Sequence, residues 1–70
     1  MNEFMNMLYN SGVGRNVSGT HWQNGHFQGV ITDVRVMYGS DLEITVDDTF
    51  LINASQFFNE GGVYSNLELY

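Results

Sequence analysis

The chain has 70 residues, no cysteine, and eight acidic side chains against two basic ones, which gives a formal net charge of −6. A chain of this length forms one small domain with a marginal core. Without cysteine it has neither a disulfide nor a thiolate–metal site to stabilise it, and formation of a homodimer is one substitute. Five phenylalanines, four tyrosines and one tryptophan argue for a folded core rather than disorder.

The charge and the absence of long apolar runs also restrict the partners. Both basic residues are arginines, so no lysine is present to meet phosphate backbones or anionic lipid headgroups. No apolar run approaches the roughly 18–20 residues that span a bilayer. The N-terminus lacks the basic segment of a secretory signal. We therefore expect a cytoplasmic protein that binds neither membranes nor nucleic acid directly.

Residues 1–11 predict a short N-terminal helix. Apolar side chains recur on one helical face, at Met1, Phe4, Met5 and Leu8. Asn2 is a suitable N-cap, and Gly12 ends the pattern. A helix of about three turns is unstable by itself, so its apolar face must dock on the rest of the chain. Residues 12–20 combine glycine, serine and asparagine without an apolar period and predict a loop.

The longest regular pattern lies in residues 28–53, where apolar and polar side chains alternate on both sides of Gly39-Ser40-Asp41. A period of two interrupted by a turn signal predicts a β-hairpin. The apolar faces meet when Tyr38 lies opposite Leu42, Val36 opposite Ile44, and Val34 opposite Val46. On the other face, Arg35 then lies within reach of Glu43 and Asp47.

A second hairpin is predicted around Asn24-Gly25, because this dipeptide favours a two-residue turn. Trp22 and Phe27 would then face each other as a cross-strand pair. Phe27 is out of phase with the alternation that follows it, so we expect the strand to bulge or bend at Gly29.

Neither the histidines nor the acidic run has the spacing of a metal site. His21 and His26 flank the second hairpin without a third or fourth ligand at a zinc spacing. The acidic run 41–48 lacks the glycine and the terminal glutamate of a calcium loop. We therefore expect no metal and no cofactor. The aromatic and polar composition of the hairpin tip suits a recognition surface.

The C-terminal third predicts a turn, a short helical segment and a last strand. After the polar residues 47–49, the parity permits either Phe50 inward with a three-residue loop or Leu51 inward with a two-residue loop. Residues 53–56 resemble a capping box and predict one helical turn. Residues 63–70 alternate again and predict a strand that edges or closes a sheet.

These elements predict a mainly β, β-rich α+β domain with helix 1–11, loop 12–20 and a β-rich body over 21–70. About five short strands with a bend favour a curled sheet or a partly open barrel. Over residues 20–58 the order of elements resembles the SH3-like and Sm-like barrels. Sm-like proteins bind RNA as rings, and the missing lysines and negative charge depart from that pattern. An α+β sheet with one face covered by the helix is the structural alternative.

The acidic surface indicates a non-catalytic module that binds a protein with a basic surface. The partner would be a host polymerase, nuclease or defence protein, whose nucleic-acid groove the carboxylates would occupy. Small acidic inhibitors of phages and mobile elements are similar in size and charge. Complementary charge would accelerate association. The expected contact residues are the acids Asp33, Asp41, Glu43, Asp47 and Asp48, with Trp22 and Phe27 as aromatic anchors.

Two other functions and one exclusion follow from the same residues. Exposed aromatics and edge strands could build a self-assembling subunit. Trp22 and Phe27 could stack on single-stranded bases, although the missing lysines oppose this. Catalysis is not expected, because the chain lacks a cysteine nucleophile, a Gly-x-Ser-x-Gly elbow and a phosphate loop with lysine.

Overall fold

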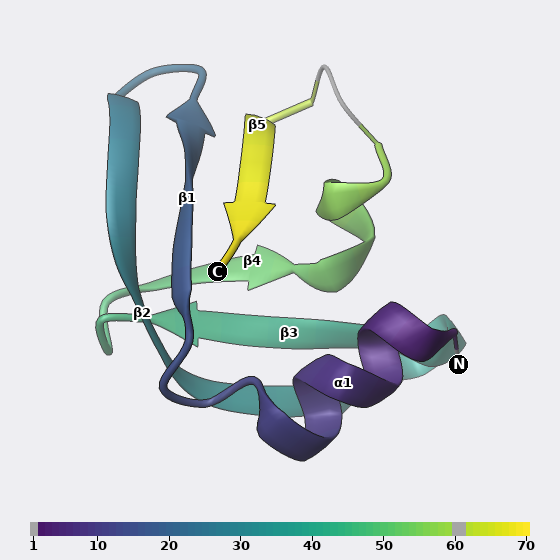
Figure 1. Ribbon diagram of the computed structural model, residues 1–70. Coiled ribbons are helices and arrows are strands. Elements are labelled where there is room, and N and C mark those ends of the chain that lie inside the picture. The colour runs from purple at the N-terminus through teal and green to yellow at the C-terminus, as the bar shows by residue number, and fades with distance from the viewer. Residues whose placement is uncertain (1, 60–61) are drawn as a thin grey trace.

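The computed structural model describes residues 2–59 and 62–70. In chain order the elements are α1 (Glu3–Ser11), β1 (Asn16–His21), β2 (Gly25–Met37), η1 (Tyr38–Ser40), β3 (Asp41–Val46), β4 (Phe50–Asn53), η2 (Ala54–Phe57) and β5 (Tyr64–Leu69). The strands form one antiparallel sheet in the order β4-β3-β2-β1-β5, with α1 packed beside it (Figure 1). The predicted mainly β class with a short N-terminal helix is confirmed. The sheet curls but does not close into a barrel, since β4 and β5 remain its two edges.

Helix α1 forms as its capping signals predict. The Asn2 side chain accepts a hydrogen bond from the Met5 amide at 2.8 Å, and the Gly12 amide donates to the Leu8 carbonyl at 2.8 Å. Met5 and Leu8 are buried, so the apolar face docks on the sheet as expected. Met1, which the sequence places on the same face, lies outside the described residues.

The loop expected over 12–20 is wrong in its second half, where β1 pairs with both β2 and β5. The misleading residue is Gly19, which lies opposite Phe27 in the register. A Cβ at this position would lie 2.6 Å from Leu67 Cδ2 and 3.1 Å from Phe27 Cε1. The glycine therefore marks a close approach of side chains to the strand and not a turn.

Strand β2 is long and bent, and its two halves pair with different neighbours. Residues 25–30 pair with β1, and residues 31–37 pair with β3. The register shifts between Ile31 and Asp33, so Thr32 is the extra residue of a β-bulge. The bulge expected at Gly29 is therefore wrong by three positions. Gly29 has another role, because a Cβ there would lie 2.5 Å from Asp47 Oδ2.

The predicted register of the central hairpin is wrong by two residues, although the faces of β3 are right. Val36 pairs with Leu42 and Val34 with Ile44, and the turn consists of residues 38–40. Asp41, expected in the loop, begins β3, because its carboxylate accepts hydrogen bonds from its strand neighbour and from η2.

The bulge also changes which side chains of β2 reach the core. Ile31, which the alternation places outward, is fully buried. Val36 is 57% exposed although its partner Leu42 is buried, and Tyr38, in the turn η1, is fully exposed. The shift of parity at Thr32 explains why Ile31 joins the core face, on which Val34 and Val36 also lie.

The C-terminal elements form, with one change in their capping. Phe50 and Ile52 point inward, so the three-residue loop of the two alternatives is confirmed. The capping box at residues 53–56 is wrong, since the Asn53 side chain makes no cap hydrogen bond. Instead, the Ser55 amide donates to Asp41 Oδ1 at 3.0 Å. The predicted last strand is β5, and it forms an edge of the sheet.

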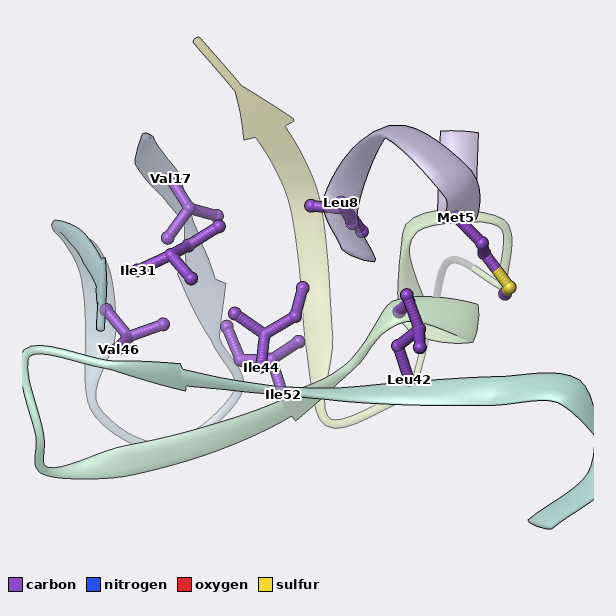
Figure 2. Close-up of a cluster of buried hydrophobic side chains, with 9 residues drawn as sticks. Met5, Leu8, Val17, Ile31, Leu42, Ile44, Val46 and Ile52 are labelled. Atoms are coloured by element: carbon purple, nitrogen blue, oxygen red, sulfur yellow. The ribbon is translucent and has the colours of Figure 1, made fainter. Parts of the chain in front are cut away.

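The core lies between α1 and the concave side of the sheet. Figure 2 shows Val17, Ile31 and Val46 gathered near the bend of β2, with Met5 and Leu8 of the helix over the other half. The remaining buried apolar residues are Leu42, Ile44, Ile52 and Ala54. None of the helices in the described residues has the length and apolarity needed to cross a membrane.

Candidate binding surfaces

One candidate surface is the side of β2, β3 and β4 that faces away from the core. Directly paired residues of antiparallel strands project on the same side of a sheet. Two rows cross these strands: Asp33 with Thr45 and Leu51, and Arg35 with Glu43 and Asn53. We call these six residues the outer face.

The outer face combines two acids, one arginine and one exposed apolar side chain. Arg35 Nε lies 3.2 Å from Asp33 Oδ2 and is paired in the register with Glu43. Both members of the ion pair are solvent-exposed, so the pair adds little to stability. Leu51 is 52% exposed in the row next to Glu43. An apolar residue bordered by charges has the composition of a small protein interface.

Two of the predicted contact residues instead form the β3–β4 turn. Asp47 and Asp48 have positive φ angles of 52° and 54°, and the Thr49 amide donates to the Val46 carbonyl at 2.9 Å. Two consecutive left-handed residues define a type I′ turn, in which aspartate is one of the tolerated side chains.

Asp47 also ties this turn to β2. Its Oδ1 accepts a hydrogen bond from the Val30 amide at 2.9 Å, and its own amide donates to the Val30 carbonyl at 2.8 Å. Its carboxylate is therefore committed to the fold. The Asp48 amide donates to Thr32 Oγ1 at 3.1 Å, whereas its side chain is exposed beside the turn.

Asp41 is likewise a structural residue. Its Oδ1 accepts from the amides of Leu42 at 2.8 Å and Ser55 at 3.0 Å, and its Oδ2 accepts from the Ser55 hydroxyl at 2.8 Å. The five predicted acids therefore do not act as one patch. Asp33 and Glu43 share the outer face, and Asp48 is exposed at the turn that follows β3.

The two predicted aromatic anchors are also separated. The β1–β2 turn contains three residues and not two, because His21 pairs with Gly25. Trp22 consequently lies at the tip of the turn and is 68% exposed. Phe27 faces Gly19 across the strands and is partly buried, so the expected cross-strand pair does not form.

A pocket that the sequence did not predict lies where the curled sheet fails to close. Its volume is about 340 Å³. It is lined by the tip of the β1–β2 hairpin and the first residues of β4 and β5, namely His21, Asn24, Gly25, His26, Phe27, Phe50 and Tyr64. We call this site the aromatic pocket. The sequence gives little signal for it, because Phe50 and Tyr64 come together only through the curl of the sheet.

The rings of the aromatic pocket meet edge to face. The Phe27 centroid lies 5.2 Å from that of Phe50, at an interplanar angle of 87°, and 5.7 Å from that of Tyr64, at 74°. His21 and Tyr64 lie 5.2 Å apart at 68°. The Tyr64 hydroxyl donates to the Leu51 carbonyl at 3.4 Å and so connects the two edges of the sheet. Burial raises the pKa of the Tyr64 phenol above its ordinary value.

The two histidines of the pocket are not placed as a metal site. His21 Nδ1 accepts hydrogen bonds from the amides of Gln23 and Asn24, each at 3.2 Å, which fixes the orientation of the ring. Across residues 2–59 and 62–70, no group of three or more His, Cys, Asp or Glu side chains could hold a metal ion.

A second hollow of about 450 Å³ lies at the other end of the sheet. It is shallow and lined by Val36, Met37 and Tyr38, all exposed at the β2–β3 turn. Because its described lining comes from one short segment, it offers less convergent chemistry than the aromatic pocket.

No family model, curated protein or solved structure was found to match this chain.

Proposed function

We propose that this chain is a non-catalytic cytoplasmic module that binds a positively charged protein partner through its outer face. The observation that carries the proposal is the placement of Asp33 and Glu43 on adjacent strands beside exposed Leu51, in a chain with a net charge of −6. The arrangement supports an apolar contact surrounded by charge, and the field of the whole chain supports rapid association with a basic surface.

The finer proposal is that the basic surface is one on which the partner handles nucleic acid, as in a polymerase, nuclease or defence protein. The chain would then act as an inhibitor that imitates phosphate. Asp33, Glu43 and Asp48 supply the charges in this proposal, because their side chains are not committed to internal caps or turns. Arg35 offsets one of them and would orient the partner.

Assembly through the sheet edges, the main alternative, receives little support. β4 has four residues, and β5 carries a bulge where Asn66 adopts a φ of 52°. Short and bulged edges are the usual means by which a sheet avoids adding further strands.

A pull-down from bacterial lysate tests the proposal, at low and moderate salt and with competing duplex DNA. The test variant Asp33→Asn/Glu43→Gln removes two charges from the outer face. The control variant Glu3→Gln/Glu68→Gln removes two charges from α1 and β5. We expect the original protein to retain a nucleic-acid-handling protein, and duplex DNA to displace it. The control variant should still retain this partner, whereas the test variant should lose it.

Two results would overturn parts of this proposal. If both double variants lose the partner equally, binding depends on the net charge of the chain and not on the outer face. Retention by the test variant, regardless of DNA, would place the interface elsewhere on the molecule.

A further inference from the structure

We propose that the aromatic pocket binds a quaternary ammonium group, such as the trimethylammonium head of a methylated lysine. The pocket shares no lining residue with the outer face, and on β4, which contributes to both, Phe50 and Leu51 project on opposite sides of the sheet. The proposal concerns this second site and does not depend on what the outer face binds.

The geometry supports an enclosure made of ring faces and edges. Phe27 stands roughly perpendicular to both Phe50 and Tyr64, and the three residues come from three strands. Rings that meet at right angles form adjoining walls, whereas parallel rings would form a stack with no space between them. His21 adds a fourth ring, whose orientation is fixed by the hydrogen bonds that its Nδ1 accepts from two backbone amides. A volume of about 340 Å³ lies within the range of small-ligand sites.

The electrostatics select a cation. The face of an aromatic ring carries the negative part of its quadrupole and attracts positive charge. Neither arginine lines the pocket. Arg15 donates to the carbonyls of Ser11 at 3.1 Å and Tyr70 at 3.4 Å, and Arg35 pairs with Asp33. The net charge of −6 further favours cations over anions.

The lining also selects the methylated form of the cation. No carboxylate is among the described lining residues, so a primary ammonium would lose water from its N–H groups without an ionic acceptor in exchange. A quaternary ammonium has no N–H group and loses less on entering. Trp22 lies beside His21 with ring centroids 6.2 Å apart and stays exposed.

The test is an NMR titration of the intact protein with three capped amino acids. These are trimethyllysine, lysine, and a neutral isostere in which a tert-butyl group replaces trimethylammonium. We expect trimethyllysine to shift the amides of Gly25, Phe27, Phe50 and Tyr64. Lysine and the neutral isostere should bind at least about tenfold more weakly than trimethyllysine, since cation–π attraction contributes on that scale.

Variants locate the site within the protein. Tyr64→Leu and Phe50→Leu each remove one ring and should weaken trimethyllysine binding by about tenfold. Tyr64→Phe keeps the ring and should bind as well as the original protein. Tyr38→Leu, at the other end of the sheet, is the matched control and should change nothing.

The outcomes separate this proposal from the function proposed above. Equal affinity for trimethyllysine and its neutral isostere would overturn the cation site, as would the absence of any shift at the pocket amides. The comparison of ligands uses the unmodified protein, so a variant that fails to fold does not remove the test. Asp33→Asn/Glu43→Gln should bind the probe normally even if it loses the basic partner.

Discussion

Substitutions of Asp47 can separate the two ways in which this turn residue stabilises the fold, its backbone conformation and its side-chain hydrogen bond. Its backbone is left-handed, with a φ of 52°, and its carboxylate accepts the Val30 amide at 2.9 Å. Alanine at a left-handed position costs about 1–2 kcal/mol more than glycine. An intramolecular hydrogen bond of this kind contributes about 1 kcal/mol net. We therefore expect Asp47→Gly to lose about 1 kcal/mol, and Asp47→Ala about 2–3 kcal/mol.

Asp47→Asn should keep most of the stability, within about 0.5 kcal/mol, because asparagine tolerates the left-handed region and retains an acceptor oxygen. The measurement is urea unfolding of the four proteins under one condition. A domain of this size is stable by roughly 4–10 kcal/mol, so the alanine variant should lose a large part of its stability. Its Tm should fall by about 10–20 °C.

The control for charge is Asp48→Asn, which makes the same change at the neighbouring turn residue with a φ of 54°. If Asp47→Ala and Asp47→Gly prove equally stable, backbone conformation is not the cause. If Asp47→Gly matches the original protein, the hydrogen bond to Val30 contributes nothing. Either result would refute the role assigned to this carboxylate.

Three further substitutions test the fold by the same unfolding measurement. Gly29→Ala should destabilise by about 1–3 kcal/mol, because its Cβ would meet the Asp47 carboxylate and Val46. Asp41→Ala should cost about 2 kcal/mol, since it removes the acceptor of the Ser55 amide and hydroxyl. Burial raises the pKa of Tyr64 above 10.0, so the folded state holds this proton more tightly and stability should fall as the pH rises past 10.0. Tyr64→Phe should lessen that fall, compared between about pH 9 and about pH 11.

Each of these expectations has a contrary result. If Gly29→Ala leaves the free energy of unfolding unchanged, the β3–β4 turn can move away from β2. An Asp41→Ala protein as stable as the original would show that water replaces the cap. Identical alkaline profiles for the Tyr64→Phe and original proteins would show that the partly buried phenol does not contribute to the pH dependence.

The sequence predicted the elements that rest on a local period. Helix α1 follows from its apolar stripe and from Asn2, and the buried face of β3 follows from strict alternation. It began the first strand of the second hairpin too late, at His21, because Gly19 has the composition of a turn. The reason for this glycine lies in the side chains of Phe27 and Leu67 on neighbouring strands. The sequence also placed the bend of β2 at Gly29, since a bulge at Thr32 leaves no compositional mark.

The candidate site was harder to predict for a related reason. Counting acids could not separate Asp33, which faces solvent, from Asp41, which caps η2. That distinction depends on neighbours that only the fold supplies. The hairpin tip was singled out as a recognition surface, but the pocket itself was missed, because Phe50 and Tyr64 belong to opposite edges and become neighbours of Phe27 only when the sheet curls.

The bend of β2 has a kinetic consequence for the aromatic pocket. At this point β2 is bonded on both sides: Ile31 exchanges hydrogen bonds with Gly14 and Arg15, and Val30 exchanges them with Asp47. These amides should resist hydrogen exchange, and the two halves of the sheet should not swing against each other. We therefore expect the pocket that lies between them to be preorganised. A ligand would enter it in a single step, without waiting for a conformational change.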